Sequence, residues 1–260
     1  MIRLGISGAA GRMGGAIIES AARSPEKYRV SLLLEANGSG NVGSSIRGLN
    51  ITDDLKAGLD DIDVLIDFTS PSATLAHLKI MADSKKAVVI GTTGFDANEI
   101  FEIEQAAKKI PVSFSSNYSV GINVLWKLLK DAVKALKADY DIDIVEEHHR
   151  MKKDAPSGTA LTTAEIILRE KGLDPASNMV FGREGKKLER DRDEIGIFAV
   201  RVGGIVGEHK VIFGSMGDKL EISHTAFSRE PLAMGALKAA EFIWSKPPKI
   251  YTMTEILGLE

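Results

Sequence analysis

Short apolar runs alternate with longer amphipathic segments through the first half of the chain. The runs are rich in β-branched residues and largely free of polar ones, which is typical of parallel strands covered on both faces. We expect such strands at Ile2–Ile6, Arg29–Glu35, Val64–Phe68, Ala87–Ile90 and Val112–Phe114. The segments between them have apolar residues at helical spacing and predict helices at Met13–Ala22, Ser72–Ser84 and Ala97–Lys109. This repeated strand–helix order predicts an α/β fold with a doubly wound parallel sheet.

The pattern changes after Gly121. Apolar residues at helical spacing predict one long amphipathic helix over Ile122–Lys137, and a second helix is expected after Pro156. Strand-like patterns surround that second helix at Tyr140–His149, Ile195–Val202, Lys210–Ser215 and Lys219–Ala226. Strands clustered in a row indicate a mixed or antiparallel sheet, and therefore a second, α+β domain.

The domain boundaries follow from this change of pattern. Arg229–Trp244 is helical again and is expected to return to the first domain. We therefore expect a first domain at residues 1–119 and 230–260 and a second at residues 120–229. Asn37–Asn50, which is rich in Gly, Ser and Asn, is expected to be a flexible surface loop.

Composition excludes several classes of protein. The 260 residues are 44% hydrophobic and 27% charged, as in an ordinary globular protein with a buried core. With 33 Lys and Arg against 36 Asp and Glu, the net charge of −3 argues against nucleic-acid binding. The absence of cysteine excludes disulfides, thiolate metal sites and a cysteine nucleophile. The apolar runs are too short to span a bilayer and a strand begins almost at the N-terminus, so we expect a cytoplasmic protein without membrane contact.

A glycine-rich turn follows the first strand directly. Gly8–Gly14, with the sequence GAAGRMG, links Ile2–Ile6 to a helix, which is the context of a phosphate-binding turn. Glycines let the backbone approach a pyrophosphate, and the helix N-terminus supplies N–H donors. Glu35 closes the second strand, where an acidic side chain accepts hydrogen bonds from the adenosine ribose. A turn that only links strand to helix is the alternative, but strand, helix and Glu35 together favour a dinucleotide site.

A second glycine-containing loop, Gly91-Thr-Thr-Gly94, follows the fourth expected strand. It lies at the carboxyl edge of the sheet, where the ligands of open α/β folds collect. This position makes it a candidate neighbour of the pyrophosphate or the nicotinamide, and a purely structural loop is the alternative.

Ionisable side chains are densest in residues 146–160, EEHHRMKKDAPSGTA. A strand ends in two histidines, a loop carries cations, and Pro156 opens a helix. Ser157–Thr159 therefore offer hydroxyls and unpaired N–H groups at a helix N-terminus, which suits a carboxylate. Lys152 can hold a second carboxylate or deliver a proton, and His148 can act as an acid near neutral pH. The segment predicts an anion-binding active site.

Simpler interpretations of this segment are open. The two histidines could bind a metal with a neighbouring glutamate, but only Glu146 with His148 or Glu147 with His149 could share a side of a strand. We therefore expect no metal.

The remaining groups also have structural alternatives. Lys152 and Lys153 could be solvated loop charges, and Ser157–Thr159 could be only a helix cap. Each alternative is reasonable alone, whereas their combination in fifteen consecutive residues favours the active site. His77 is expected to be structural, and His209 is assigned no role.

The chain resembles a known family in several segments. These are GAAGRMG at Gly8–Gly14, IDFT at Ile66–Thr69, GTTGF at Gly91–Phe95, NYSVGIN at Asn117–Asn123, HHRMKKDAPSGTA at His148–Ala160, VGEH at Val206–His209 and EISH at Glu221–His224. Their order, over nearly the whole chain, resembles that of the dihydrodipicolinate reductases. The segment that begins at His148 is highly specific, whereas GAAGRMG alone is not.

The resemblance implies a Rossmann-like dinucleotide-binding domain and a substrate-binding and oligomerisation domain that joins a homotetramer. It implies NAD(P)H-dependent reduction of 4-hydroxy-tetrahydrodipicolinate, a small cyclic dicarboxylate, to tetrahydrodipicolinate in diaminopimelate and lysine biosynthesis. His148 and Lys152 would form the catalytic pair, and which of them donates the proton stays open. The residues implied to hold the dicarboxylate are His149, Lys152, Ser157, Gly158 and Thr159.

The resemblance also implies the cofactor site. Its residues are Gly8, Ala9, Ala10, Gly11, Arg12, Met13, Glu35, Gly91, Thr92, Thr93, Ser116, Asn117 and Tyr118, the last in place of a frequent Phe. Family members that use NADPH well tend to carry Arg where this chain has Ala36 and Ser70. Glu35 would repel a 2′-phosphate, and Arg12 could partly compensate. We therefore expect NADH to be used at least as well as NADPH.

Two other functions are considered. One is another two-domain NAD(P)-dependent reductase of amino-acid metabolism, such as aspartate-semialdehyde or homoserine dehydrogenase. A semialdehyde dehydrogenase that forms a thioester needs a cysteine, and this chain has none. The other is a non-catalytic NAD(P)H sensor, which would not need His148 and Lys152 beside an anion site.

Overall fold

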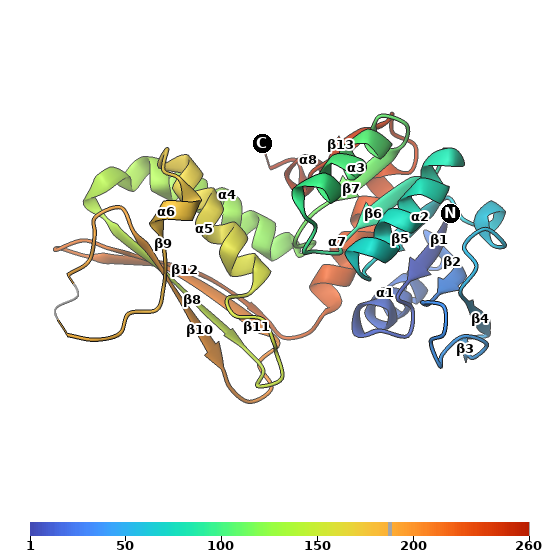
Figure 1. Cartoon of the computed structure of the whole chain (residues 1–260), viewed down its shortest axis with the longest axis horizontal. Coiled ribbons are helices and arrows are strands. Elements are labelled where there is room, and N and C mark those ends of the chain that lie inside the picture. The colour runs from blue at the N-terminus through green and yellow to red at the C-terminus, as the bar shows by residue number, and fades with distance from the viewer. Residues whose placement is uncertain (187–188, 260) are drawn as a thin grey trace. The chain divides into compact units, whose positions relative to one another are not determined.

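The computed structural model describes residues 1–186 and 189–259, which form two compact units (Figure 1). The first unit comprises Met1–Val120 and Arg229–Glu260, and the second comprises Gly121–Ser228. Each unit has its own sheet and its own buried cores. Among the helices of the described residues, none is long and apolar enough to cross a membrane.

An eight-stranded sheet forms the centre of the first unit. Its strands are β1 (Ile2–Ser7), β2 (Tyr28–Leu34), β3 (Ser45–Ile46), β4 (Leu49–Thr52), β5 (Val64–Asp67), β6 (Ala87–Ile90), β7 (Pro111–Phe114) and β13 (Lys249–Tyr251). They lie in the order β13-β7-β6-β5-β1-β2-β4-β3, and neighbours are parallel except for β3 and β4. The order runs outward in both directions from β1 and β5, which confirms the predicted doubly wound sheet.

Helices cover both faces of this sheet. On one face α1 (Arg12–Ala22) packs against α7 (Glu230–Ile243), and on the other α2 (Pro71–Asp83) packs against α3 (Ala97–Ala107) (Figure 1). Val64 and Ile66 of β5 join the core beneath α1 and α7, while Leu65 joins the core beneath α2 and α3. This double burial explains why the strands are apolar throughout. A 3₁₀ turn (Leu59–Asp61) precedes β5, and α8 (Met253–Leu257) packs on α7.

The expectation of a loop over Asn37–Asn50 is wrong for its last part. Strands β3 and β4 form a hairpin through Arg47 and Gly48, whose φ angles of 50° and 82° suit a tight two-residue turn. Strand β4 also extends the parallel sheet beyond β2. The polar composition of this segment gives no strand pattern. Strands β3 and β4 have two and four residues, and they form because β4 pairs with β2 and β3 pairs with β4.

A five-stranded mixed sheet forms the second unit. Its strands are β8 (Asp141–His148), β9 (Met179–Phe181), β10 (Ile195–Arg201), β11 (Gly207–Gly214) and β12 (Lys219–Ala226), in the order β12-β11-β8-β10-β9. Strands β8, β9 and β10 are mutually parallel, and β11 is antiparallel to both β8 and β12. This arrangement confirms the predicted mixed sheet.

Two long helices, α4 (Val120–Leu136) and α5 (Gly158–Glu170), cover one face of the mixed sheet. A 3₁₀ turn (Lys137–Asp139) and the short α6 (Pro175–Asn178) complete the helical layer. Burial alternates residue by residue along β8 and β11, so every second residue is buried on the face beneath the helices, and Ile142, Ile144, Val211 and Phe213 join the core there. The opposite face carries the half-buried Val145, Phe198 and Ile212.

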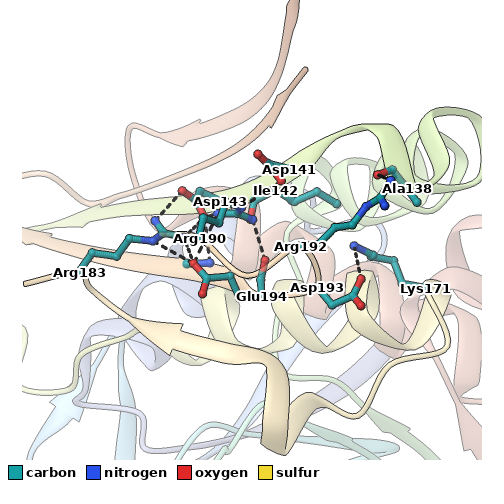
Figure 2. A network of polar contacts seen from close by, with 11 residues as sticks. Ala138, Asp141, Ile142, Asp143, Lys171, Arg183, Arg190, Arg192, Asp193 and Glu194 are labelled. Carbon is teal, nitrogen blue, oxygen red and sulfur yellow. Dashed lines mark hydrogen bonds and ion pairs between the residues drawn. The ribbon is translucent and has the colours of Figure 1, made fainter. Parts of the chain in front are cut away.

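An ion-pair network lies where β8 and β10 begin (Figure 2). The carboxylate of Asp143 accepts hydrogen bonds from Arg183 at 2.8 and 3.0 Å and from Arg190 at 2.6 Å. It also accepts the backbone N–H of Gly196 at 2.9 Å. Arg183 additionally pairs with Glu194. These contacts attach Arg183 and Arg190, which lie between β9 and β10 in the sequence, to the start of β8.

Candidate active site

Polar side chains gather on the helix-covered face of the mixed sheet, where β8 and β10 end and β11 begins. Glu146 and His148 lie two residues apart on β8, and both are buried. Arg201 is the register partner of His148 on β10, and His209 is the register partner of Glu146 on β11. The sheet therefore brings together four side chains that are far apart in the sequence.

Glu146 is the hub of this cluster. Its carboxylate lies 2.5 Å from Nδ1 of His148 and accepts both terminal nitrogens of Arg201 at 2.7 and 2.8 Å. It also accepts the backbone N–H of Ser157 at 2.9 Å. Burial would raise the pKa of Glu146, but the hydrogen bonds from His148, Arg201 and Ser157 outweigh it and lower the pKa to about 2. The carboxylate is therefore ionised at neutral pH, and Nδ1 of His148 must be the donor of their hydrogen bond.

His209 is a buried histidine next to this hub. Its ring lies edge-on to that of His148 with centroids 5.3 Å apart, and its Nε2 lies 3.0 Å from Oγ of Ser157. Burial, with the nearby charge of His148, lowers the pKa of His209 to about 3, so the ring is neutral near pH 7. The sequence assigned it no role, although the VGEH segment was part of the resemblance.

Helix α5 begins at Gly158, two residues later than Pro156, and Ser157 is its N-cap. The hydroxyl of Ser157 accepts the N–H of Ala160 at 3.2 Å, so the capping interpretation is correct for this side chain. Ser157 is buried, its N–H is bonded to Glu146, and its hydroxyl contacts His209. Gly158 is exposed and Thr159 half-buried at the same helix end. The first turn of α5 thus presents backbone at Gly158 and Thr159 rather than a free serine hydroxyl.

Lys152 lies in the loop between β8 and α5. Its Nζ is 2.8 and 2.9 Å from the carboxylate oxygens of Asp154, and its side chain is only 20% exposed. Lys153 beside it is exposed, as expected for a solvated loop charge. His149 is half-buried just after β8. Within residues 1–186 and 189–259, no group of three or more His, Asp and Glu side chains is arranged to hold a metal ion.

The glycine-rich turn of the first unit has the geometry of a phosphate-binding turn. Gly8 has φ +76°, a conformation that favours glycine, and a β-carbon on Gly14 would lie 2.2 Å from the carbonyl oxygen of Gly8. The N–H groups of Gly8 and Ala9 bond to Leu34. Helix α1 has neither a side-chain cap nor an acidic residue in its first turn. Its first amides therefore suit an anion, and the tight turn fits a dinucleotide pyrophosphate.

Glu35 and Arg12 lie at this turn. Glu35 follows β2, and its carboxylate accepts the N–H of Ala10 at 2.8 Å. Arg12 is exposed at the first position of α1, next to the half-buried Met13. Burial and the positive charge of Arg12 lower the pKa of Arg229, the residue before α7. Two guanidinium groups are therefore close enough to repel each other at this end of the sheet. Only Arg12 was a candidate from the sequence.

A buried carboxylate supports the second glycine loop. Asp67 accepts the hydroxyls of Thr69 at 2.6 Å and Thr74 at 3.1 Å, and lies 2.7 Å from Nδ1 of His77, which agrees with the structural role expected for His77. The hydroxyl of Thr92 bonds to Thr74 and to the N–H of Thr69, so this side chain is internal.

The neighbouring residues Gly91 and Thr93 differ in their surroundings. A β-carbon on Gly91 would lie 2.1 Å from the ring of Phe68, whereas Thr93 is exposed. The loop can therefore offer backbone atoms and Thr93 to a ligand.

The segment Ser116–Tyr118 is largely internal. Tyr118 is fully buried, and its hydroxyl bonds to the carbonyl oxygens of Ile90 and Ser113 at 3.0 Å each. Burial raises the pKa of Tyr118. The side chain of Asn117 accepts the N–H of Ser119 at 2.8 Å, and Ser116 is exposed. The ring of Tyr118 therefore belongs to the core, and this segment meets solvent at Ser116.

Comparison with known proteins agrees with the resemblance noted in the sequence. Residues 2–118 match the family "Dihydrodipicolinate reductase, N-terminus" and residues 121–257 match "Dihydrodipicolinate reductase, C-terminus". The 4-hydroxy-tetrahydrodipicolinate reductase of Dechloromonas aromatica (strain RCB) is 44% identical over 99% of this chain and 98% of its own. That of Hahella chejuensis (strain KCTC 2396) is 43% identical over all of both chains.

A solved structure extends this similarity to the fold. The dipicolinate-bound dihydrodipicolinate reductase from Paenisporosarcina sp. TG-14 superposes with a TM-score of 0.78 and 25% identity, covering 98% of each chain. The similarity spans both units and both glycine loops of this protein. The chain therefore belongs to the dihydrodipicolinate reductase family, the NAD(P)H-dependent oxidoreductases that reduce 4-hydroxy-tetrahydrodipicolinate in lysine and diaminopimelate biosynthesis.

Proposed function

We propose that this chain reduces 4-hydroxy-tetrahydrodipicolinate to tetrahydrodipicolinate with NAD(P)H, and that the second unit binds the substrate. The observation that carries this proposal is that His148 and Ser157, the N-cap of α5, both hydrogen-bond to the carboxylate of Glu146, while Lys152 lies in the loop between them. After loss of water the substrate is a conjugated imine, which takes a hydride at one carbon and a proton at the next. The protein must supply orientation, anion binding and one proton.

The residues of the second unit divide these tasks. We assign one substrate carboxylate to the backbone N–H groups of Gly158 and Thr159, where the helix dipole favours an anion. Ser157 shapes this turn as the N-cap of α5, and its hydroxyl also contacts Nε2 of His209. Lys152 and His149 bind the second carboxylate, with Lys152 exchanging Asp154 for the substrate. His148, held through Nδ1, presents Nε2 as the acid.

We assign dinucleotide binding to the first unit, Met1–Val120 with Arg229–Glu260. Bound NAD(P)H supplies the hydride. The turn Gly8–Met13 binds the pyrophosphate at the N-terminus of α1, which has no side-chain cap. The carboxylate of Glu35 exchanges its hydrogen bond from the N–H of Ala10 for the hydroxyls of the adenosine ribose. Gly91, Thr92, Thr93 and Ser116–Tyr118 line the site mainly through backbone atoms, because the side chains of Thr92 and Tyr118 are buried.

We further propose that NADH is used at least as well as NADPH. Ala36 and Ser70 offer no charge to a 2′-phosphate, and the Glu35 carboxylate would repel one. Arg12 and Arg229 partly oppose this preference, because both carry positive charge near the start of α1.

We also propose a homotetramer assembled through the second unit, acting in the cytoplasm. The half-buried apolar side chains Val145, Phe198 and Ile212 on the uncovered face of the mixed sheet support such an interface. Light scattering should give four times the chain mass, and a monomer at assay concentration would contradict this assembly. The place of the activity in amino-acid biosynthesis supports the cytoplasm.

A turnover assay tests the proposed reaction. The unstable substrate is generated in situ by coupled synthesis, and NADH oxidation is followed with and without it. We expect oxidation only when substrate is supplied, and competitive inhibition by dipicolinate. Oxidation with a semialdehyde but not with this substrate would favour a different reductase, and cofactor binding without any turnover would favour a sensor.

A further inference from the structure

Glu146 is a buried carboxylate that the proposed reaction does not bring into contact with the substrate. Its side chain has no exposed surface and lies on the same face of β8 as His148. We propose that Glu146 is a positioning residue that holds the proton on Nδ1 of His148, so that Nε2 is the atom that delivers a proton to the substrate. This inference rests on the proposed function of His148 as the acid.

The surroundings of Glu146 require a carboxylate. Four hydrogen bonds from three residues converge on its two oxygens, and each oxygen accepts two of them. Arg201 contributes a two-pronged pair, one nitrogen to each oxygen. An amide in this place would turn an N–H₂ group toward two donors, whichever way it faced. Glutamine is therefore nearly the same shape as glutamate but cannot satisfy the same partners.

Arg201 keeps the proton on the imidazole. The guanidinium is itself held by the carbonyl oxygens of Val200 and Asp154, at 2.7 Å each, so it cannot turn away freely. If the Nδ1 proton moved to Glu146, the ion pair with Arg201 would be lost inside the protein. The pKa of Glu146, about 2, expresses the same preference for the ionised carboxylate.

The charge on His148 is set by a small group of neighbours. The charged and titratable groups around it are Glu146 on β8, Arg201 on β10, His209 on β11, His224 on β12, and Lys152 and Asp154 in the loop before α5. Lys152 pairs with Asp154, and His209 is neutral near pH 7. Glu146 is thus the anion in direct contact with the ring, and removing its charge takes away an attraction that favours the protonated ring.

The same carboxylate connects the acid to the anion site. Glu146 accepts the N–H of Ser157, the residue that caps α5, at 2.9 Å. One side chain therefore fixes both the ring of His148 and the turn that precedes Gly158. A ring and a carboxylate site held by a common group keep a fixed separation, which a proton transfer to bound substrate needs.

The tautomer of His148 tests the inference without any substitution at Glu146. The chain has five histidines, so ¹⁵N spectra of histidine-labelled enzyme are simple, and loss of one signal set in His148→Gln identifies His148. We expect the neutral ring to carry its proton on Nδ1, with an unprotonated Nε2. A proton on Nε2 in the neutral wild-type ring would overturn the proposal.

Kinetics of three variants test the consequence. Glu146→Gln should lower kcat by about 10²-fold, because a histidine in the wrong tautomer loses general acid catalysis. The limb of kcat/KM that falls as the acid loses its proton should move to lower pH. Glu146→Asp keeps a carboxylate and should retain more activity than Glu146→Gln. Glu147→Gln is the matched control, because Glu147 is next in sequence but lies on the opposite face of β8.

The outcomes separate this inference from the proposed function. Wild-type kcat and an unshifted pH limb in Glu146→Gln would overturn the role of Glu146 while leaving the reaction intact. A wild-type enzyme that does not reduce the substrate would reject the proposed function, and the ¹⁵N spectrum would still decide which atom of His148 carries the proton. The spectrum also decides the matter if Glu146→Gln fails to fold.

Discussion

The imidazole of His148 lies against Gly207, where an added β-carbon would stand 3.1 Å from Nε2 and 3.5 Å from Cδ2. Gly207 is paired with Ala226 across β11 and β12, so its backbone cannot easily move away. Gly207→Ala should therefore displace the ring from Glu146 and lower kcat by about tenfold or more. Gly214→Ala, at the other end of β11 with open space around its β-carbon, is the matched control. Equal kcat values for the two variants would show that the ring of His148 can accommodate a β-carbon at position 207 without losing its function.

Substitutions of the proposed catalytic pair should differ in their kinetic signature. His148→Gln removes an acid that is fixed in the sheet, so kcat should fall by about 10²–10⁴-fold with little change in substrate KM. Lys152→Ala removes the charge that we assign to a substrate carboxylate, so kcat should fall and KM should rise. NADH affinity, measured by fluorescence titration, should be unchanged in both. Wild-type kcat in both variants, with unchanged thermal melts, would remove these residues from the mechanism.

The double variant of His148 and Lys152 adds a test of their cooperation. If both act on one proton transfer, the combined loss in kcat should be smaller than the product of the single losses. A fully multiplicative loss would assign the two residues to independent steps.

Two adjacent glycines of α1 should respond in opposite ways. A β-carbon on Gly14 would meet the backbone of the glycine turn at 2.2 Å, whereas a β-carbon on Gly15 meets nothing within 4 Å. Gly14→Ala should therefore weaken NADH binding and destabilise the first unit. Gly15→Ala should leave binding intact and stabilise the helix by about 0.5–1 kcal/mol. Calorimetric titration and thermal melts of the pair measure both effects, and equal NADH affinities would contradict the assigned pyrophosphate site.

Cofactor preference is measured by comparing kcat/KM for the two dinucleotides. We expect the ratio of NADH to NADPH to be at least one, since Ala36 and Ser70 provide no cation for a 2′-phosphate. Ala36→Arg should shift the ratio toward NADPH by about tenfold, equivalent to about 1.4 kcal/mol. A wild-type preference for NADPH of more than about tenfold would mean that Arg12 and Arg229 outweigh Glu35.

The Asp143 network predicts a pH-dependent contribution to stability. Burial would raise the pKa of Asp143, but the hydrogen bonds from Arg183 and Arg190 outweigh it and lower the pKa. The ion pairs therefore stabilise the fold above the ordinary carboxyl pKa of about 4, and this stabilisation is lost as the pH falls through the lowered pKa.

Asp143→Asn should accordingly lower the free energy of unfolding by about 1–3 kcal/mol at pH 7, and by less in acid. Urea unfolding at several pH values measures this difference. Asp131→Asn is the control, because Asp131 is 56% exposed and forms a surface ion pair with Lys127 at 3.6 Å. Such exposed pairs contribute little to stability. The prediction fails if both variants lose the same free energy at pH 7.

Elements were predictable where the apolar pattern within their own residues is complete. Ala87–Ile90 is a strand with the predicted bounds, since four apolar residues in a doubly covered sheet are all buried. The helix predicted over Ile122–Lys137 differs from α4 by only a residue or two at each end. Strands β9 and β13 have three residues each and exist only through pairing with β10 and β7, so no window of sequence contains their signal.

The site was predicted only in part, because some of its contacts join residues that are far apart in the sequence. The pattern placed Glu146 and His148 on one side of a strand, but only as a possible metal pair. The carboxylate that contacts His148 is also held by Arg201, which lies 55 residues beyond Glu146 and is brought there by the register of β8 and β10. His209 reaches Ser157 across 52 residues in a similar way. Such contacts follow from strand order, which the sequence of one strand does not contain.

The position of α7 near the end of the sequence has a consequence for the order in which the two units fold during translation. This helix supplies the fully buried Ala233, Ala236 and Leu237 to the core of the first unit, yet it is translated after the whole of the second unit. While the ribosome is still adding residues, β1 and β5–β7 have an apolar face without its cover. Gly121–Ser228, being continuous, can close its core earlier. The nascent chain therefore completes its inserted unit before its host, and it depends on its final segment to protect the host from aggregation.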